Sequence, residues 1–464
     1  MKNKIFYQFI RTLLSFCSII ILGVLLVSCS KSQKAIIVSP PPAGSYNLSG
    51  VITNSVSNGS IPNATVTLYP SYASTTTDSS GHFIFNGVSN GSYQISVSKE
   101  GYIRYMKSIS ITKDSSVAIV LKESSLPFHA GVTFNFWFQP NAASQINFNM
   151  YSKQDFINAQ SLGCDVIRLP INLNYMVTDT LSYTLDPVFL NDLDQVVSWA
   201  ESLHMYLILD NHSYYASGIT PSMEPMLIKV WQQMAAHYAA RSNYILYETL
   251  NEPHDLPDTT WGRMQQQIIN TIRSQDKKHT IMVDADNFDS YNNLGLLPKY
   301  SDDNLVYDFH FYDPMVFTHQ GASFINPPLT SLLNVPFPYN PNSMPPFPSS
   351  LDGTYFQQQF DDYQNQGTVA NLQNLINVAI AFRDSSHAKI FCGEFGVLND
   401  APDNDRVFWY QSVRSYLEQN NISFTIWDYK DVFGLFKPGS AASFPNDLNI
   451  PLVQALNFNV PQTH

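Results

Sequence analysis

Short apolar runs that alternate with amphipathic segments, from about residue 126 onward, are the feature that most limits the possible fold. Eight of these runs have the length and composition of buried strands, because each is rich in branched aliphatic or aromatic residues. The predicted strands span residues 131–137, 165–169, 205–210, 244–250, 280–284, 305–309, 389–393 and 422–427. A chain with this alternation buries its strands as a parallel sheet covered by helices.

The segments between the runs have helical periodicity. In one of them the apolar residues recur at helical spacing, at Phe189, Leu193, Val196, Val197 and Ala200. Eight strands alternating with helices over about 340 residues predict an α/β fold, a (β/α)₈ TIM barrel over residues 126–464. The alternative is a doubly wound open sheet, which usually carries a glycine-rich phosphate loop after its first strand. The sequence has no such loop there, so the barrel is the preferred interpretation.

Residues 46–122 have a different character, with short β-rich runs separated by Gly, Asn and Ser turns. The spacing predicts a small all-β sandwich, with strands at 48–52, 65–69, 82–85, 93–97 and 117–121. The strings SGVITN, IPNATVTLY, TTTDSSGHFIFNGV and GSYQISVSKEGY resemble the carboxypeptidase-regulatory-like β-sandwich of secreted bacterial proteins. The sandwich has no convergent His, Asp and Glu set. We interpret it as a spacer or interaction module, with carbohydrate binding as the alternative.

The N-terminal segment has the features of an export signal. Residues 1–28 begin with basic residues and continue with a nearly uninterrupted apolar stretch from 13 to 27. The stretch ends in LVSC, which resembles the bacterial lipobox and implies cleavage before Cys29, lipidation of its thiol and attachment of the exported protein to a membrane. The alternative is an ordinary signal peptide or a membrane anchor. Residues 29–45 form a polar, proline-containing tether. The string SKSQK after Cys29 has no acidic cluster, which leaves both the periplasmic face and the cell surface open.

Composition limits the partners. The net charge of −12 argues against nucleic acid, because phosphate binding needs a basic surface. The aromatic fraction of 13% is compatible with a carbohydrate partner, since sugars stack on aromatic faces. The four cysteines form no CxxC pair and no cluster with histidines, so neither a metal site nor a disulfide framework is expected. Cys164 and Cys392 are predicted to be buried free thiols.

Polar and aromatic residues stand where the predicted strands stop. They are Arg168, His212, Asn251, Glu252, His310, Tyr312, Glu394 and Trp427. A (β/α)₈ barrel keeps its chemistry at the C-terminal ends of its strands. We therefore expect these residues on one face, with Glu252 and Glu394 facing each other across one cleft.

The strings that carry these residues resemble the retaining glycanases of glycoside hydrolase family 5. The matching strings are LGCDVIRLP, LILDNH, ILYETLNEP, VYDFHFYDP, FCGEFG and FTIWDY. The resemblance implies that Glu252 is the general acid/base, Glu394 the nucleophile and Asn251 a contact to the sugar 2-hydroxyl. It also implies that no metal or cofactor is needed.

The same resemblance assigns the remaining residues. Arg168 and Tyr312 would flank the nucleophile, His212 and His310 would shape the reacting subsite, and Trp427 would be its stacking floor. The expected activity is that of a retaining endo-β-1,4-glucanase on cellulose-type or mixed β-glucans. The other family activities, β-mannanase and xyloglucanase among them, stay open, and the sequence predicts no oligomeric state.

Elementary chemistry supports these roles. Retention needs two carboxyl groups roughly 5–5.5 Å apart, one to protonate the leaving oxygen and one to attack the anomeric carbon. Arg168 would favour the charged form of Glu394. A poorly solvated position and the negative charge of Glu394 would both raise the pKa of Glu252.

Two alternatives from other functional classes remain. A non-catalytic glycan-binding lipoprotein is disfavoured by the presence of both glutamates. A metal-dependent barrel hydrolase would need a ligand cluster, for which His212 and His310 are available without an HxH pair. Residues 314–350 contain nine prolines and many aromatic residues, and we expect this long insertion to form a cleft wall over the active face.

Overall fold

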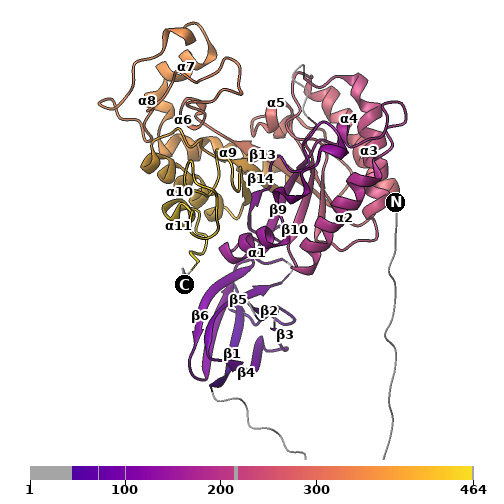
Figure 1. The fold of residues 1–464 in the computed structure, drawn as a ribbon, viewed down its shortest axis with the longest axis vertical. Helices are drawn as coiled ribbons and strands as arrows, with labels where there is room; N and C mark the ends of the chain where they lie inside the picture. Colours follow the sequence, from indigo (N-terminus) through magenta and orange to yellow (C-terminus); the bar gives the residue numbers. More distant parts are fainter. Residues whose placement is uncertain (1–43, 70, 72, 100, 214–217, 462–464) are drawn as a thin grey trace, which may run out of the picture. The chain divides into compact units, whose positions relative to one another are not determined.

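The computed structural model describes residues 44–69, 71, 73–99, 101–213 and 218–461, and its elements are labelled in Figure 1. The predicted export signal, Cys29 and nearly all of the predicted tether lie outside these residues. Within them, no helix combines the length and apolar character that a membrane crossing requires.

Eight parallel strands, β8 to β15, close into a barrel in which each strand pairs with the next along the chain and β15 pairs with β8. The predicted (β/α)₈ fold is confirmed. The strands are β8 (Ala130–Thr133), β9 (Val166–Ile171), β10 (Tyr206–Asn211), β11 (Ile245–Glu248), β12 (Thr280–Val283), β13 (Leu305–Phe311), β14 (Ile390–Phe395) and β15 (Ser423–Ile426).

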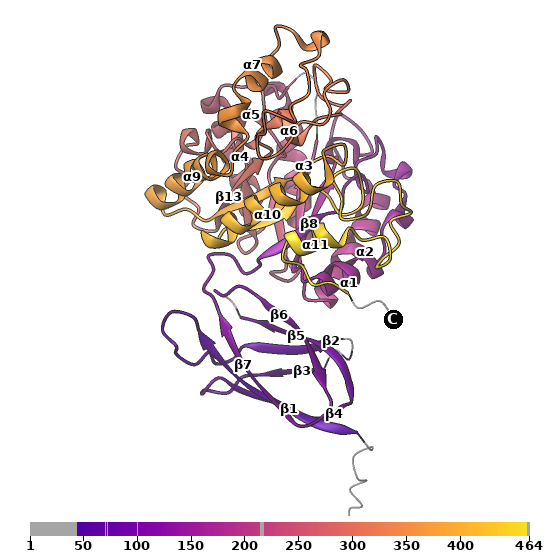
Figure 2. The ribbon, with the colours of Figure 1, turned by 90° about the vertical axis from the view of Figure 1, so that its left-hand side faces the viewer.

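Most of the helices surround the barrel, and the short helices between residues 315 and 366 lie at one end of it (Figures 1 and 2). The helices are α1 (Lys153–Leu162), α2 (Pro187–Ser202), α3 (Glu224–Tyr238), α4 (Asp258–Gln275), α5 (Asp286–Asp289), α6 (Met315–Thr318), α7 (Tyr355–Asp361), α8 (Tyr363–Gln366), α9 (Val369–Ser386), α10 (Asp403–Gln419) and α11 (Ile450–Ala455). The helix α2 shows how sequence sets their position. Asp186 caps it by accepting from the backbone N–H of Val188, and the five apolar residues predicted at helical spacing are those it buries.

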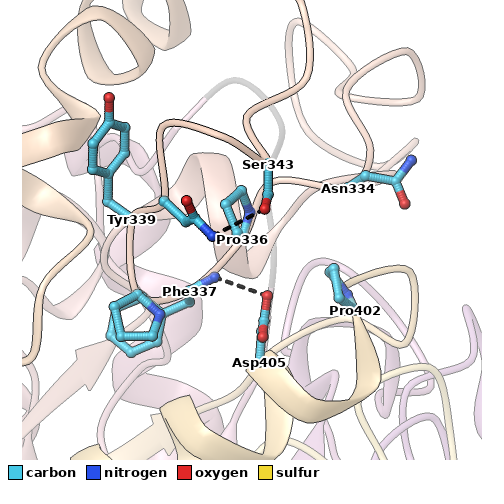
Figure 3. Close-up of a pocket in the computed structure, with 9 residues that line it drawn as sticks. Asn334, Pro336, Phe337, Tyr339, Ser343, Pro402 and Asp405 are labelled. Atoms are coloured by element: carbon cyan, nitrogen blue, oxygen red, sulfur yellow. Dashed lines mark hydrogen bonds between the residues drawn. The ribbon is translucent and has the colours of Figure 1, made fainter.

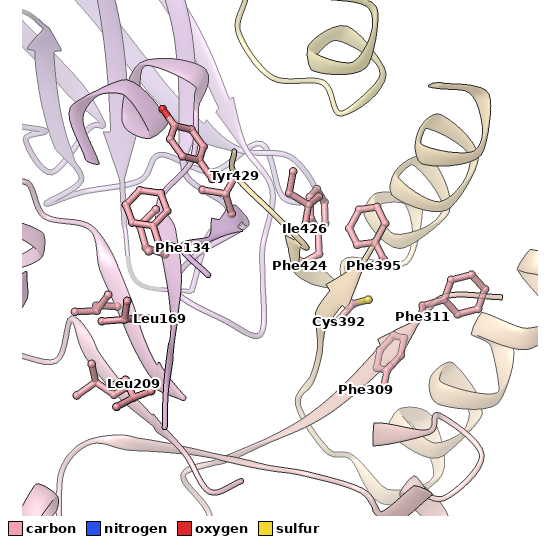
Figure 4. Packing of buried hydrophobic residues seen from close by; sticks show 14 of the residues in the cluster. Phe134, Leu169, Leu209, Phe309, Phe311, Cys392, Phe395, Phe424, Ile426 and Tyr429 are labelled. Atoms are coloured by element: carbon pink, nitrogen blue, oxygen red, sulfur yellow. The ribbon is translucent and has the colours of Figure 1, made fainter. Parts of the chain in front are cut away.

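Alternate residues of the barrel strands face opposite sides. One set, with Leu169, Leu209, Phe309 and Phe395, belongs to the apolar cluster that the strands share with the helices (Figure 4). The other set faces the barrel interior. Near the strand starts it forms a separate apolar cluster, which we call the end cluster and which contains Leu126, Phe128, Val166, Ile208, Leu246, Met282, Val306 and Phe391. This second cluster fills one end of the barrel interior.

The N-terminal residues form two sheets. One has the order β4-β1-β7 and the other β3-β2-β5-β6. Their bounds are β1 (Ser45–Asn54), β2 (Thr65–Tyr69), β3 (Ala73–Thr76), β4 (His82–Ser89), β5 (Gly91–Ser98), β6 (Tyr105–Ile111) and β7 (Ser115–Leu121). Sequence reasoning missed β3 and β6, which are the two edges of one sheet. The short, mostly exposed β3 has no buried face to impose an alternating pattern.

The insertion after β13 contributes to the core rather than lying loosely over it. Leu329, Leu332, Val335 and Phe337 are buried in the barrel's main apolar cluster. Figure 2 shows α5, α6 and α7 at the same end of the barrel. Cys164 and Cys392 are buried free thiols, as predicted.

Candidate active site

Two donors converge on the carboxylate of Glu394. The Arg168 guanidinium donates through Nη1 to Oε1 of Glu394, and the Tyr312 hydroxyl donates to Oε2 at 2.7 Å. Glu394 is 4% exposed and Arg168 is fully buried. Charge-assisted bonds of this kind are the strong ones, and both donors fix the carboxylate in one orientation.

Three of the predicted site residues lie inside strands, which corrects the expectation that they stand where strands stop. Arg168 is in β9, His310 in β13 and Glu394 in β14, and each strand runs past its polar residue. The predicted strand ends were too early, because an apolar run breaks wherever an interior position is polar. These residues face the barrel interior instead.

A register shift at Gly393 places Glu394 on that interior face. The pairing of β13 with β14 shifts there, so that Phe309 is opposite Cys392 while His310 is opposite Glu394. The extra residue reverses the alternation and turns Glu394 inward beside His310. A Cβ at position 393 would lie 2.2 Å from a carboxylate oxygen of Asp308, so only glycine fits.

Glu252 follows β11 and has a left-handed backbone, with φ of 46°. Its Oε1 lies 2.8 Å from Nδ1 of His310. One oxygen of Glu252, one of Glu394 and a ring nitrogen of His310 all lie within 4.8 Å of one another. The structure therefore brings the two glutamates together at a spacing close to that of retaining glycosidases.

Burial raises the pKa of Glu252, which is one of the two causes expected from sequence; the other, the charge of Glu394, is not among the causes found. The positive charge of Arg168 acts in the opposite direction. A quarter of the Glu252 side chain remains exposed, which leaves it accessible from the cleft. A carboxyl group in this setting holds its proton to higher pH than one in water.

Asn251 is oriented by the same arginine. Its Oδ1 accepts from Nη2 of Arg168 at 2.8 Å, and its backbone N–H donates to the carbonyl of Asn211. With its oxygen directed at the guanidinium, the carboxamide turns its nitrogen the other way. That orientation suits donation to a sugar hydroxyl.

His212 and Trp427 form the aromatic part of the site. The two rings are stacked, with centroids 5.5 Å apart and planes at 12°. Nδ1 of His212 lies 2.8 Å from Oδ2 of Asp210, which in turn is paired with Arg168. Burial lowers the pKa of His212 and of His310 to about 4, so both rings are neutral near pH 7. These contacts connect all the predicted site residues in one network.

Sequence reasoning missed a layer of buried acids beneath this network. These acids face the barrel interior. They are Asp210, Glu248, Asp284 and Asp308, and each lies two positions after a residue of the end cluster. We call these four carboxyl groups and Arg168 the buried polar layer. The signal in the sequence was an acidic residue within or directly after an otherwise apolar strand.

Arg168 is the cation of the buried polar layer. Glu248 accepts from its Nε at 2.8 Å and also from Nη2, and Asp210 lies 3.0 Å away. Burial raises the pKa of Asp284 and of Asp308 well above the usual range, and that of Asp210 to about 7. Burial disfavours the charged forms of these acids, because unpaired negative charge is costly in the protein interior.

Two groups of side chains in the described ranges have the spacing to hold a cation. One is Glu252, His310 and Glu394, and the other is Glu248, Asp284 and Asp308. In the second group, both oxygens of Glu248 already accept from Arg168. Arg168 thus already supplies a positive charge to one of the three acids in this group.

One pocket lies on the insertion, outside this site. It has a volume of about 640 Å³ and is lined by the insertion and the start of α10, including Asn334, Tyr339, Ser343 and Asp405 (Figure 3). Asp405 accepts there from the backbone N–H of Phe337 and fixes the insertion on α10. The pocket brings no pair of catalytic groups together.

Comparisons with known proteins agree with this geometry. Residues 130–432 match the family model described as cellulase (glycosyl hydrolase family 5). Residues 47–122 match the carboxypeptidase regulatory-like domain. The second match agrees with the resemblance seen in the N-terminal strings.

Two individual relatives are named endoglucanases. Endoglucanase C of Acetivibrio thermocellus is 26% identical over 317 residues, which cover 65% of this chain and 91% of the relative. Endoglucanase 3 of Fibrobacter succinogenes is 28% identical over 351 residues, covering 69% of this chain and 52% of the relative.

Among solved structures, endoglucanase Cel5A from the hyperthermophilic Thermotoga maritima superposes with a TM-score of 0.60 at 20% identity, covering 71% of this chain and 96% of that one. At this identity the likeness supports the barrel fold. The family model spans more than half of the chain, and with it the chain belongs to the cellulases of glycosyl hydrolase family 5 and is a glycoside hydrolase.

Proposed function

We propose that this glycoside hydrolase is an endo-β-1,4-glucanase that cleaves cellulose-type or mixed-linkage β-glucans with retention of configuration. The observation that carries the proposal is the cluster of Glu252, His310 and Glu394, whose polar atoms lie within 4.8 Å of one another. Relatives that are named endoglucanases support the choice of glucan.

In the first step, Glu394 attacks the anomeric carbon while Glu252 protonates the leaving oxygen. Arg168 and Tyr312 hold the nucleophile in place, so little reorganisation is needed at the moment of attack. The raised pKa of Glu252 keeps its proton available.

In the second step, water hydrolyses the glycosyl ester. Esterified Glu394 carries no charge, so Glu252 becomes a stronger acid and loses its proton more readily. The ionised Glu252 then accepts a proton from the incoming water. Neutral His310 stays hydrogen-bonded to Glu252 and keeps its carboxyl group aimed at the reacting bond.

The remaining predicted residues bind the sugar. Asn251 donates to the 2-hydroxyl, a contact that strengthens as positive charge develops on the ring. Trp427, stacked on His212, forms the floor under the reacting sugar. Near the insertion, Ile325 packs with Tyr312 and Trp427 around Phe433, which favours the insertion as a wall of this cleft.

The experiment is a product analysis on a panel of glycans. Purified protein is incubated with cellulose, mixed-linkage glucan, glucomannan and xyloglucan, and the anomer formed first is followed by proton NMR. We expect fastest release from the glucans, internal cleavage and an initial β-anomer. An initial α-anomer would exclude retention, and a clear preference for mannan or xyloglucan would replace the proposed specificity.

We also propose that the enzyme is exported and anchored to a membrane through lipidated Cys29, with the β-sandwich as a spacer. The LVSC string and the apolar stretch before it support this location. Expression of the full chain in a bacterium, followed by fractionation, tests it. We expect activity in the membrane fraction and incorporation of labelled palmitate into the wild type but not into Cys29→Ala, and equal labelling of the two proteins would contradict the anchor.

A further inference from the structure

Glu252 is held in its left-handed conformation by a segment that sequence reasoning did not single out. Its backbone N–H donates to Oδ2 of Asp289 at 2.8 Å. Asp289 is fully buried, although it lies 37 residues away along the chain. A non-glycine residue with positive φ needs such support from its surroundings, because the conformation is intrinsically unfavourable.

The segment that carries Asp289 is itself built for this contact. Asn287, Phe288 and Asp289 are three consecutive residues with left-handed backbones, at φ of 62°, 62° and 50°. The N–H of Phe288 donates to the carbonyl of Pro253 at 3.1 Å, and its ring stacks on that of His254 with centroids 4.3 Å apart. The segment therefore clamps the turn that begins at Glu252.

We propose that Asp289 is a positioning residue for Glu252, which fixes the backbone of the proposed acid/base so that its carboxyl group meets His310 and faces Glu394. The inference rests on the proposed function, because only that function gives an effect of Asp289 on the rate a meaning. The contact itself does not depend on that function, because it is a relation between a buried carboxyl group and a strained backbone.

Asp289 acts in this role as a neutral acceptor. Burial, together with Asp284 and Asp308, raises its pKa well above the usual range. Neutral His310 that donates from Nδ1 to Glu252 has a lone pair on Nε2, and this nitrogen lies 3.9 Å from Oδ2 of Asp289. An ionised Asp289 would repel that lone pair, whereas a protonated one does not. A carboxamide should therefore replace the carboxyl group.

The test compares Asp289→Ala and Asp289→Asn on two substrates. Cellopentaose has a poor leaving group that needs protonation, and 2,4-dinitrophenyl β-cellobioside has a good one that does not. We expect Asp289→Ala to lower kcat/KM on cellopentaose roughly 10- to 100-fold, as for a misplaced catalytic group, and on the aryl glycoside less than about threefold. Asp289→Asn keeps the acceptor and should lose less than about threefold on both.

Asp286→Ala is the matched control, in the same four-residue segment Asp286–Asp289. Asp286 is buried in the same segment, so its loss perturbs the segment without touching the Glu252 contact. Equal losses of Asp289→Ala on the two substrates, or a loss in Asp286→Ala of the same size and substrate dependence, would reduce Asp289 to a structural residue. A loss in Asp289→Asn as large as in Asp289→Ala would overturn the neutral-acceptor role.

Crystal structures of the wild type and of Asp289→Ala keep the two proposals separate. We expect Glu252 to leave the left-handed region and its carboxyl group to move away from His310. Unchanged geometry in the variant would overturn the positioning role whatever the activity. Absence of hydrolysis by the wild type on every glucan would instead overturn the proposed function, and the structures would still decide the role of Asp289.

Discussion

Arg168 and Glu394, separated by 226 residues in the sequence, are hydrogen-bonded inside the barrel, and the same guanidinium also binds Glu248 and Asn251. One buried cation thus orients the proposed nucleophile, the proposed sugar contact and a structural carboxylate. Stability and catalysis depend on the same side chain.

Arg168→Lys should therefore damage both properties. Lysine keeps the charge but cannot make the several directed bonds of the guanidinium. We expect kcat to fall at least about 100-fold and the free energy of unfolding to drop by about 3–5 kcal/mol, as when a buried ion pair loses one partner. Steady-state kinetics and urea unfolding measure the two effects. Arg263→Ala is the control, because its ion pair with Glu224 is half-exposed, and it should cost no more than about 1 kcal/mol.

Replacing the two glutamates should separate their roles. Glu252→Ala should lower kcat/KM on cello-oligosaccharides about 10²- to 10⁴-fold and spare aryl glycosides with good leaving groups, which need no protonation. Glu394→Ala should abolish turnover on both while the protein still folds and binds oligosaccharide. Kinetics on the paired substrates and calorimetric binding provide the measurements. Equal losses on both substrates in Glu252→Ala would contradict its role as an acid.

Asp284→Asn should change how stability depends on pH. The folded protein holds the Asp284 proton well above pH 4, whereas the unfolded chain releases it near pH 3.9. Wild-type stability should therefore fall as pH rises from about 4 toward the folded pKa, and the carboxamide variant should escape this loss. The difference should widen by up to about 1.4 kcal/mol per pH unit.

Thermal unfolding at pH 4, 5.5 and 7 measures this difference for Asp284→Asn. Asparagine can still accept from the N–H of Leu250, as Asp284 does, so packing should change little. Asp361→Asn, an exposed change on α7, is the control and should show a difference that stays constant with pH. A constant difference for Asp284→Asn as well would show that Asp284 is ionised in the folded state.

Removal of divalent cations should leave activity intact. Arg168 already supplies positive charge to Glu248, and the proposed chemistry uses only protons and carboxylates. We expect the same kcat/KM on cellopentaose before and after dialysis against EDTA. A loss that Ca²⁺ or another divalent ion restores would favour the metal-dependent alternative.

Phe324 in the insertion is the residue with which to test the cleft wall. It is 62% exposed, and its ring lies 6.0 Å from His319 and 6.3 Å from Phe433. Phe324→Ala should raise KM for cellohexaose about three- to tenfold through a lost stacking contact, with kcat nearly unchanged. Leu181→Ala, at a position 95% exposed, is the control. Unchanged kinetics in both variants would remove Phe324 from the substrate path.

The sequence predicted the barrel because its alternation is a property of every strand and helix. It also predicted which residues meet around the two glutamates, since strands of one barrel share an end. It missed the four acids of the buried polar layer, although they lie inside the predicted strands, because the sequence alone does not show that they gather around Arg168 in the barrel interior. The clamp by Asp289 was beyond sequence reasoning, because the left-handed backbones at 287–289 involve no glycine.

The alternation along the barrel strands has a consequence for insertions and deletions. The end cluster and the buried polar layer occupy one set of alternate positions in the barrel strands, and the outward apolar face occupies the other set. Deleting one residue from β9 or β10 would exchange the two faces, placing acids among the helices and aliphatic side chains in the cleft. A residue inserted into or deleted from these strands would therefore disturb the interior, whereas the long proline-rich segment of this chain lies after β13, outside the barrel strands.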